Sequence, residues 1–282
     1  EGLESSLETF AAFAAFAAFA VLQRTLASSI HMGNSLSPEQ LLANANAALL
    51  DFGVAHFKAT SIYEKEKQDI SYRTFNVQLE GDNGEPKHIY TIHHYHNKTN
   101  NDEIPLVMIH GYSQSAAQFY AGLPAIANEY KGRVYAIDLF GCGLSSRPPW
   151  TLGYGNDVQL EVAESYFTDR LEDWRKAMGF SKMKIAGHSI GGYLAVAYCE
   201  KYPSSVEDLI LLSPVGLPAR EMRIDEATLP WYFKLGRTLW QRGWSPFDLA
   251  SISGKYLPDY YSHARYRDAS WISKPLLGEQ LY

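Results

Sequence analysis

The chain has 282 residues, of which 46% are hydrophobic and 20% are charged, and its formal net charge is −6 at pH 7. This composition excludes an intrinsically disordered chain, and no apolar run reaches the roughly 18 residues that a membrane-spanning helix needs. The net negative charge argues against nucleic acid as a partner, because there is no general positive field to attract phosphate backbones. Two cysteines cannot form a disulfide framework, and free thiols fit an intracellular compartment.

The first predicted element is a low-complexity hydrophobic helix over residues 10–22, in which phenylalanine recurs at every third position. A helix of this length extends about 20 Å, which is too short to cross a bilayer. It can lie on a membrane or a partner, or it can be a leader upstream of the native start. Residues 1–36 are therefore set apart as an N-terminal extension.

A possible acylation signal lies near the end of this extension. The sequence that starts at Met32 has the Met-Gly-x-x-x-Ser pattern of N-myristoylation. If translation starts at Met32, Gly33 becomes the acylated terminus, and a second membrane signal is needed because one acyl chain binds only marginally. This motif favours peripheral association with an intracellular membrane, the mitochondrion being one possible compartment.

Residues 37–48 are predicted to form an accessory helix, with Ser37 as the N-cap and Gln40 completing a capping box. Alternating segments at 70–79 and 88–96, joined by a glycine-rich turn, predict a β-hairpin. Three histidines in the second segment, His93, His94 and His96, could form a metal site only if the strand bulged, since alternate residues face opposite sides. We interpret them instead as a polar face on an exposed strand, and we expect neither metal nor organic cofactor.

The segment that indicates chemistry is 183–203, which contains the G-x-S-x-G pattern Gly187-His188-Ser189-Ile190-Gly191 between an apolar strand and an apolar helix. A serine at such a turn has strained dihedrals, and the flanking glycines leave room for the crowded backbone. The N–H of Ile190, at the start of the helix, is positioned to stabilise an oxyanion. Ser189 is therefore the predicted nucleophile.

An earlier apolar strand at 106–109 runs into His110-Gly111-Tyr112, and we assign the second oxyanion donor to the N–H of Tyr112. The strand at 133–139 ends near Asp138. His110 and His188 flank the site and are interpreted as structural. A tight glycine turn with a passive serine is the alternative interpretation.

The segments PLVMIHGYSQS, AIDLFGCGLSSRP, GHSIGGYLAVAYCEKYP and LILLSPVGLP together resemble the α/β-hydrolases, in particular the subgroup of cardiolipin-specific deacylase and the lysophospholipid and N-acyl phospholipid lipases. The resemblance covers about residues 70–220. It implies a mostly parallel sheet with a helical cap and a lipid acyl ester as substrate. It also implies that Ser189 is the nucleophile, that the backbones of Tyr112 and Ile190 form the oxyanion hole, and that Asp138 orders the neighbouring loops.

The sequence after the core is expected to form a cap. We place the hydrolase core at 37–216 and an aromatic-rich lid at 217–282, which contains Trp231 and Trp271 and several arginines. This lid could form a lipid groove, or it could simply pack its rings on the core.

The expected catalytic acid and base are not apparent. In this fold an Asp or Glu and then a His follow the nucleophile on later strands, but His263 is the one histidine after Ser189, and no apolar strand precedes it. We therefore expect the C-terminal strands to be missing, which leaves 206–215 as a hydrophobic edge strand.

Two functional hypotheses remain open. The first is a serine hydrolase of phospholipid-type acyl esters that needs a second polypeptide to complete the fold. The alternative is a non-catalytic structural or lipid-binding subunit of a larger complex.

Overall fold

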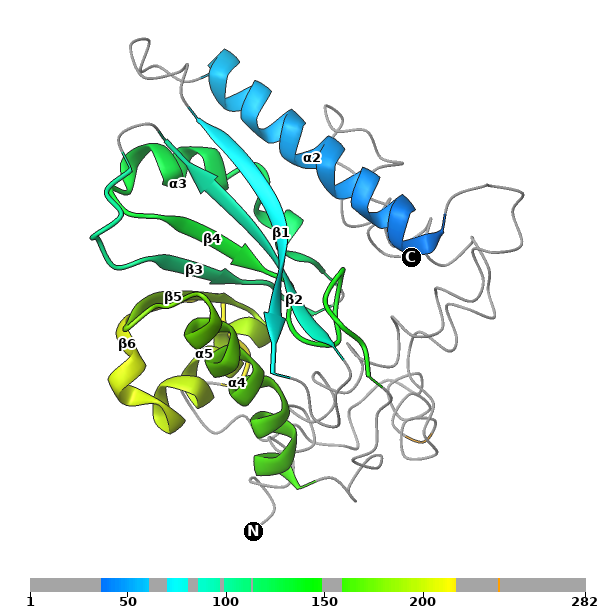
Figure 1. Ribbon diagram of the computed structural model, residues 1–282, viewed down its shortest axis with the longest axis vertical. Helices are drawn as coiled ribbons and strands as arrows, with labels where there is room; N and C mark the ends of the chain where they lie inside the picture. The colour runs from blue at the N-terminus through cyan, green and yellow to red at the C-terminus, as the bar shows by residue number, and fades with distance from the viewer. Residues whose placement is uncertain are drawn as a thin grey trace, which may run out of the picture.

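The computed structural model describes residues 37–60, 70–80, 86–96, 99–112, 114–148, 159–216 and 238 (Figure 1). Within them, six strands form one sheet in the order β1-β2-β4-β3-β5-β6. The strands are β1 (Ser71–Leu79), β2 (Lys87–Tyr95), β3 (Leu106–Ile109), β4 (Val134–Ile137), β5 (Met183–His188) and β6 (Val206–Leu212). The predicted hairpin, β1 and β2, is antiparallel to the rest, and β4, β3, β5 and β6 are parallel.

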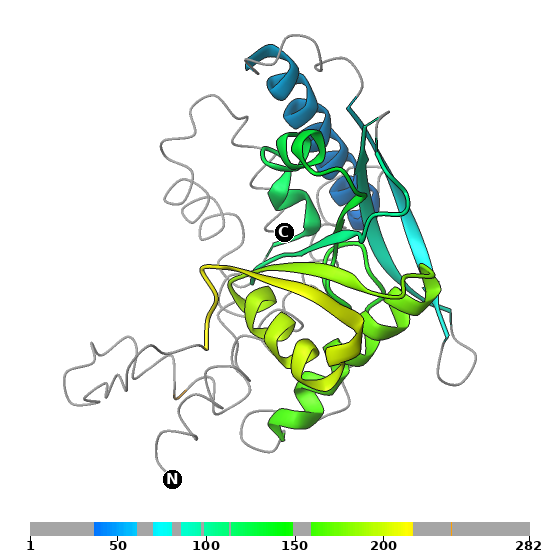
Figure 2. The ribbon, with the colours of Figure 1, turned by 90° about the vertical axis from the view of Figure 1, so that its left-hand side faces the viewer.

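Helices cover both faces of this sheet (Figure 2). The helical elements are α2 (Pro38–Thr60), η3 (Ala116–Phe119), α3 (Leu123–Glu129), α4 (Leu160–Ala177), α5 (Ile190–Lys201) and η5 (Pro203–Ser205). Alternate residues of β3 show the two layers, because Met108 packs in the cluster with α2, η3 and α3, whereas Val107 and Ile109 pack in the cluster with α4 and α5. Strands buried on both faces explain the continuous apolar runs in the sequence.

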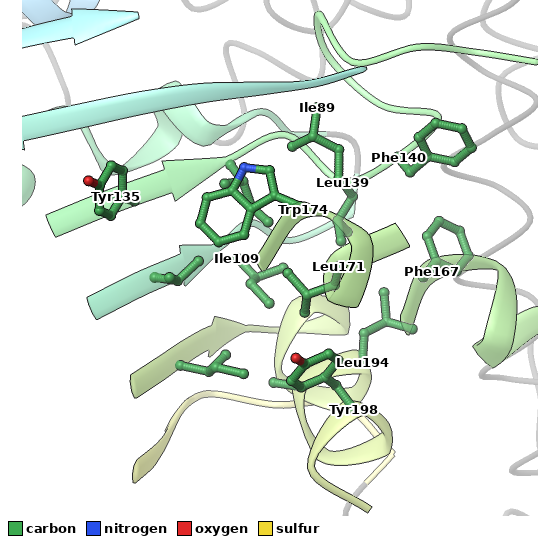
Figure 3. Packing of buried hydrophobic residues seen from close by; sticks show 14 of the residues in the cluster. Ile89, Ile109, Tyr135, Leu139, Phe140, Phe167, Leu171, Trp174, Leu194 and Tyr198 are labelled. Atoms are coloured by element: carbon green, nitrogen blue, oxygen red, sulfur yellow. The ribbon is translucent and has the colours of Figure 1, made fainter. Parts of the chain in front are cut away.

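The larger hydrophobic cluster lies between the parallel strands and helices α4 and α5, and Trp174 is at its centre (Figure 3). Trp174 is fully buried, and its Nε1–H donates a hydrogen bond of 2.9 Å to Thr91 Oγ1 on β2. The polar edge of the indole is therefore satisfied while its rings pack against the core. This contact attaches α4 to the hairpin.

Helix α2 begins with the predicted capping box. Gln40 N–H donates to Ser37 Oγ at 3.2 Å, and Ser37 N–H donates to Gln40 Oε1 at 2.7 Å. The helix continues to Thr60, well beyond the predicted end near residue 48, because Leu49 and Leu50 are fully buried in the cluster with β2 and β3. Tertiary packing extends the helix past the limit that local signals suggested.

The prediction of an exposed polar strand at His93, His94 and His96 is wrong, because all three side chains are buried. His93 stacks on Tyr135 at a centroid distance of 4.4 Å, and His94 stacks on Tyr72 at 5.5 Å. The β1–β2 register runs without a bulge, so His93 and His94 face opposite sides of the sheet. Among the described residues, no group of three His, Cys, Asp or Glu side chains could hold a metal ion.

Strand β6 is the edge of the described sheet, as the sequence predicted. Four consecutive apolar residues, Leu209–Leu212, are between 36% and 42% exposed. Ion pairs join the start of this strand to β5 and to the residue before it, since Lys184 Nζ lies 2.8 Å from Asp208 Oδ2 and Lys182 Nζ lies 3.0 Å from Glu207 Oε2. The apolar end of β6 pairs with β5 on one side, and on its other side no strand among the described residues pairs with it.

Several predictions fall outside the described residues. They concern the extension 1–36 with Met32 and Gly33, the lid at 217–282 apart from residue 238, and His263. None of the helices in the described part of the chain is long and apolar enough to span a membrane.

Candidate active site at the carboxyl edge of the sheet

Ser189 lies in a strained turn between β5 and α5. Its φ is 54° and its ψ is −119°, a conformation that non-glycine residues rarely adopt. A Cβ added to Gly187 would lie 2.4 Å from the carbonyl oxygen of Gly191, and one added to Gly191 would lie 2.5 Å from the carbonyl oxygen of His110. The glycines on both sides of the serine thus make the tight strand-to-helix turn possible, as the motif predicts.

The turn is held by backbone hydrogen bonds from two directions. Gly192 N–H donates to the carbonyl oxygen of Ser189 at 3.0 Å, which begins α5. From the other side, Ser189 N–H donates to the Leu212 carbonyl at 3.1 Å, and Val215 N–H donates to the Ser189 carbonyl at 3.2 Å. The end of β6 therefore supports the nucleophile turn, a contact that the sequence reasoning missed because it depends on the strand order.

Ile190 is the first residue of α5, so its N–H has no acceptor within the helix. The helix dipole places partial positive charge at the same end. These features are what an oxyanion-hole donor requires.

The loop after β3 is shaped by the buried side chain of His110. Leu139 N–H donates to His110 Nε2 at 3.0 Å, so the neutral ring carries its proton on Nδ1, which donates to the carbonyl oxygen of Gly111 at 2.8 Å. In a trans peptide the C=O and the next N–H point in opposite directions. The hydrogen bond from His110 therefore turns the Tyr112 N–H away from the imidazole. Burial lowers the pKa of His110, which preserves this neutral tautomer.

His188 brings this loop against the nucleophile turn. A Cβ added to Gly111 would lie 2.7 Å from His188 Nδ1, so the imidazole fills the space beside the loop backbone. In the structure, His110 thus orders the loop after β3, and His188 packs beside that loop.

Asp138 connects two loops at the end of β4. Its Oδ1 accepts from Ala116 N–H at 2.6 Å, and its Oδ2 accepts from Leu144 N–H at 2.7 Å. Gly143, with φ of 52°, allows the close approach, since an added Cβ would lie 1.9 Å from Oδ2. Burial raises the pKa of Asp138, and His110 and the two backbone donors oppose that shift. Asp138 is thus a loop-ordering residue.

Hydrogen bonds of two serines also hold the loop after β4, and the sequence did not predict them. Ser145 Oγ donates to the Asp138 carbonyl at 2.8 Å and accepts from Tyr90 N–H at 2.9 Å. Ser146 is similarly attached to His88, whose N–H donates to Ser146 Oγ at 2.8 Å. The only signal in the sequence is a pair of serines after the glycines of the loop.

The predicted nucleophile, oxyanion donors and supporting residues all lie at the carboxyl ends of β3, β4 and β5. Ligands of open α/β sheets bind at this edge. In the described part of the chain, no side chain forms a hydrogen bond with Ser189 Oγ, and His263 lies outside it. The geometry thus brings Ser189 together with the N–H of Ile190 and the loop of Tyr112 at this edge of the sheet.

Comparison with known proteins agrees with this geometry. A family model described as the alpha/beta hydrolase fold matches residues 104–240. The chain is 38% identical over 153 residues to 1-acylglycerol-3-phosphate O-acyltransferase ABHD5 of Sus scrofa, a match that covers 54% of this chain and 41% of that protein. It is 36% identical over 172 residues to 1-acylglycerol-3-phosphate O-acyltransferase of Arabidopsis thaliana, a match that covers 57% of this chain and 38% of that protein. The chain spans about two fifths of the length of these relatives.

Solved structures show the same fold at lower sequence identity. The epoxide hydrolase CorEH is 18% identical, with a TM-score of 0.52 over 75% of this chain and 67% of that one. Cfl2 of Burkholderia cenocepacia is 20% identical, with a TM-score of 0.50 over 76% and 65%. With its mostly parallel sheet, its helices on both faces and its serine turn, this chain has the α/β-hydrolase fold.

Proposed function

We propose that this protein acts on lipid acyl esters through an acyl intermediate on Ser189. The observation that carries the proposal is the strained Ser189 turn, with the N–H of Ile190 at the start of α5 and the loop of Tyr112 beside it. The names of the relatives, which refer to acyl transfer involving 1-acylglycerol-3-phosphate, support a lipid acyl ester as substrate class.

In the proposed reaction, Ser189 Oγ attacks the ester carbonyl carbon while its proton passes to a general base. The carbonyl oxygen becomes an oxyanion that accepts from the N–H groups of Tyr112 and Ile190. The bond to the leaving alcohol then breaks, and the proton from the base goes to that alcohol. Water releases the acid, or a second alcohol takes the acyl group. His263 is the one histidine that follows Ser189 in this sequence, and no apolar strand precedes it, so the proposal assigns the base to a further polypeptide segment.

A second polypeptide segment is part of the proposal. The apolar residues 209–212 of β6 are exposed, and a strand with this composition is normally buried on both faces. A segment that covers β6 would lie next to the Leu212–Ser189 hydrogen bond. Such a segment is therefore well placed to supply an acid and a base. The other proposed partner is a lipid or a membrane surface.

The alternative is a non-catalytic lipid-binding subunit. It is favoured by the lack of any side chain hydrogen-bonded to Ser189 Oγ in the described ranges. The two functions are separated by turnover of a 1-acylglycerol-3-phosphate by the full-length protein and its Ser189→Ala variant. Ser204→Ala, at an exposed serine of η5, is the matched control. Loss of turnover in Ser189→Ala alone supports the enzyme, whereas equal turnover in all three proteins overturns it.

A further inference from the structure

Arg147 is a half-buried cation without a direct partner in the described part of the chain. Its Nε is enclosed and has no hydrogen-bond acceptor there, and its guanidinium forms no ion pair with a described carboxylate. Two arginines of α4 are ion-paired, since Arg170 binds Asp173 at 2.6 Å and Arg175 binds Glu172 at 2.6 Å. Arg133 shares the unpaired Nε of Arg147, but its guanidinium lies over the ring of Phe180 at 4.9 Å.

The surroundings of Arg147 leave its charge poorly compensated. Burial lowers its pKa, while Cys142, Asp138 and Glu39 act in the opposite direction with smaller effect. Asp138 is not its direct acceptor, since its two carboxylate oxygens accept from the backbone N–H groups of Ala116 and Leu144 and form no ion pair with Arg147. A guanidinium removed from water normally binds an anion, since burial without a partner is costly.

The loop that carries Arg147 is attached at the carboxyl edge of the sheet. The preceding residue, Ser146, donates its N–H to the His88 carbonyl at 3.0 Å and accepts from Gly141 N–H at 2.9 Å, so the loop is attached to β2. Asp138, one of the charges that act on Arg147, also interacts with His110 of the oxyanion loop. Arg147 thus lies on the carboxyl edge of the sheet, where the substrate is expected.

We propose that Arg147 binds the phosphate group of a phosphate-bearing acyl lipid whose ester lies at Ser189. This assignment rests on the proposed function and names the residue that would recognise the head group. Arginine suits this role because its planar guanidinium forms paired hydrogen bonds with phosphate oxygens. A bound phosphate would supply the hydrogen-bond acceptors that Arg147 loses when it is removed from water.

Glu39 sets the strength of this site. It is an exposed residue in the first turn of α2, and its charge acts on Arg147 without a contact within ion-pair distance. A bound phosphate is repelled by Glu39 while it is attracted by Arg147. Removal of the Glu39 charge should therefore strengthen binding, which is the opposite of the effect of removing Arg147.

The test measures binding in the full-length Ser189→Ala protein, so that turnover is not required. The ligands are a short-chain 1-acylglycerol-3-phosphate and the 1-acylglycerol with the same acyl chain, each below its micelle concentration. We expect Arg147→Gln to weaken binding of the phosphate lipid about tenfold and Glu39→Gln to strengthen it a few-fold, with the neutral lipid unaffected. Arg170→Gln is the matched control, because Arg170 is ion-paired and lies over Phe140 of the same loop.

Inorganic phosphate is the competitor that separates a lipid head group from a free ion. Competition that is weak in the millimolar range supports a lipid site, whereas tight binding of phosphate alone, with no added affinity for the lipid, overturns it. Equal losses for both lipids in Arg147→Gln, or no loss for either, also overturn the proposal. If Ser189→Ala leaves turnover unchanged but the Arg147 effects on binding persist, the proposed function fails and the phosphate site stands.

Discussion

The amide N–H of Ser189 donates a hydrogen bond of 3.1 Å to the carbonyl oxygen of Leu212, so the nucleophile turn is attached directly to the last residue of β6. Leu212 is also one of the four exposed apolar residues at the sheet edge. The edge strand and the proposed active site are therefore one structural unit, and a segment that covers β6 will also stabilise the turn.

This connection predicts the effect of charges on β6. Replacing Ile210 and Leu212 with lysine should reduce self-association of the protein, because charged residues protect an exposed strand edge. Light scattering over a range of protein concentrations measures the change. Self-association that persists in the double variant, with an unchanged circular dichroism spectrum, would show that the protein does not self-associate through β6.

Variants of His110 test how the oxyanion loop is positioned. Asparagine places a donor near the position of Nδ1 and can keep the contact with Gly111, whereas glutamine reaches the position of Nε2 and can keep the contact with Leu139. We expect His110→Asn to retain more of the acylation rate than His110→Gln, which should lose tenfold or more, since the Gly111 contact orients the Tyr112 N–H. KM should change less than kcat. A purely structural role would instead lower both variants in proportion to their melting temperatures.

The carboxylate of Asp138 gives a stability prediction. In Asp138→Asn, the amide NH2 must face one of the two backbone N–H donors, from Ala116 or Leu144, so one hydrogen bond is replaced by a donor–donor contact. We expect the free energy of unfolding to fall by about 2 kcal/mol. Urea denaturation measures the change. A loss under 0.5 kcal/mol would mean that the loops do not depend on this residue.

The nucleophile turn, the hairpin and the parallel strands could be predicted because each is encoded locally. Gly187 and Gly191 flank Ser189 at fixed spacing, and strand alternation is visible over 70–96. Burial of His93 could not be predicted, because it depends on Tyr135, a residue of a distant strand that packs on it. The support of Ser189 by Leu212 and the isolation of Arg147 likewise depend on strand order and loop packing, which no local pattern contains.

Two ion pairs of α4 differ in exposure, and substitutions in them should therefore differ in their effect on stability. Glu172 accepts two hydrogen bonds from Arg175, at 2.6 and 2.8 Å, and one from Tyr198 at 2.6 Å. Glu172→Gln should destabilise the protein by about 3 kcal/mol, because Glu172 is buried and the half-buried guanidinium of Arg175 loses its carboxylate partner. The matched control is Asp173→Asn, which breaks the more exposed i,i+3 pair with Arg170 and should cost under 1 kcal/mol. Similar losses in both variants, measured by urea denaturation, would contradict this assignment.

Histidines 93 and 94 predict a loss of stability in mild acid. Burial first, and then neighbouring cationic groups, lower the pKa of His93 to about 4 and that of His94 to about 3. Their unfolded pKa is about 6.5, so between pH 6.5 and 4 the unfolded state binds more protons than the folded state. The free energy of unfolding therefore decreases as the pH is lowered through this range. Each histidine contributes a slope of up to about 1.4 kcal/mol per pH unit.

Glutamine at each of these two positions tests that slope. His93→Gln and His94→Gln should reduce the stability difference between pH 7.5 and 5, as measured by urea denaturation at both pH values. An unchanged difference in both variants would mean that other groups cause the acid sensitivity.

The most direct test of the central claim is mass spectrometry of peptides from the full-length protein after reaction with a fluorophosphonate, with any partner that co-purifies. The proposed mechanism predicts a phosphonyl adduct on Ser189 that is absent from Ser189→Ala and unaffected in Ser204→Ala. The absence of an adduct on Ser189, under conditions in which a known serine hydrolase is fully labelled, would contradict the assignment of Ser189 as the nucleophile.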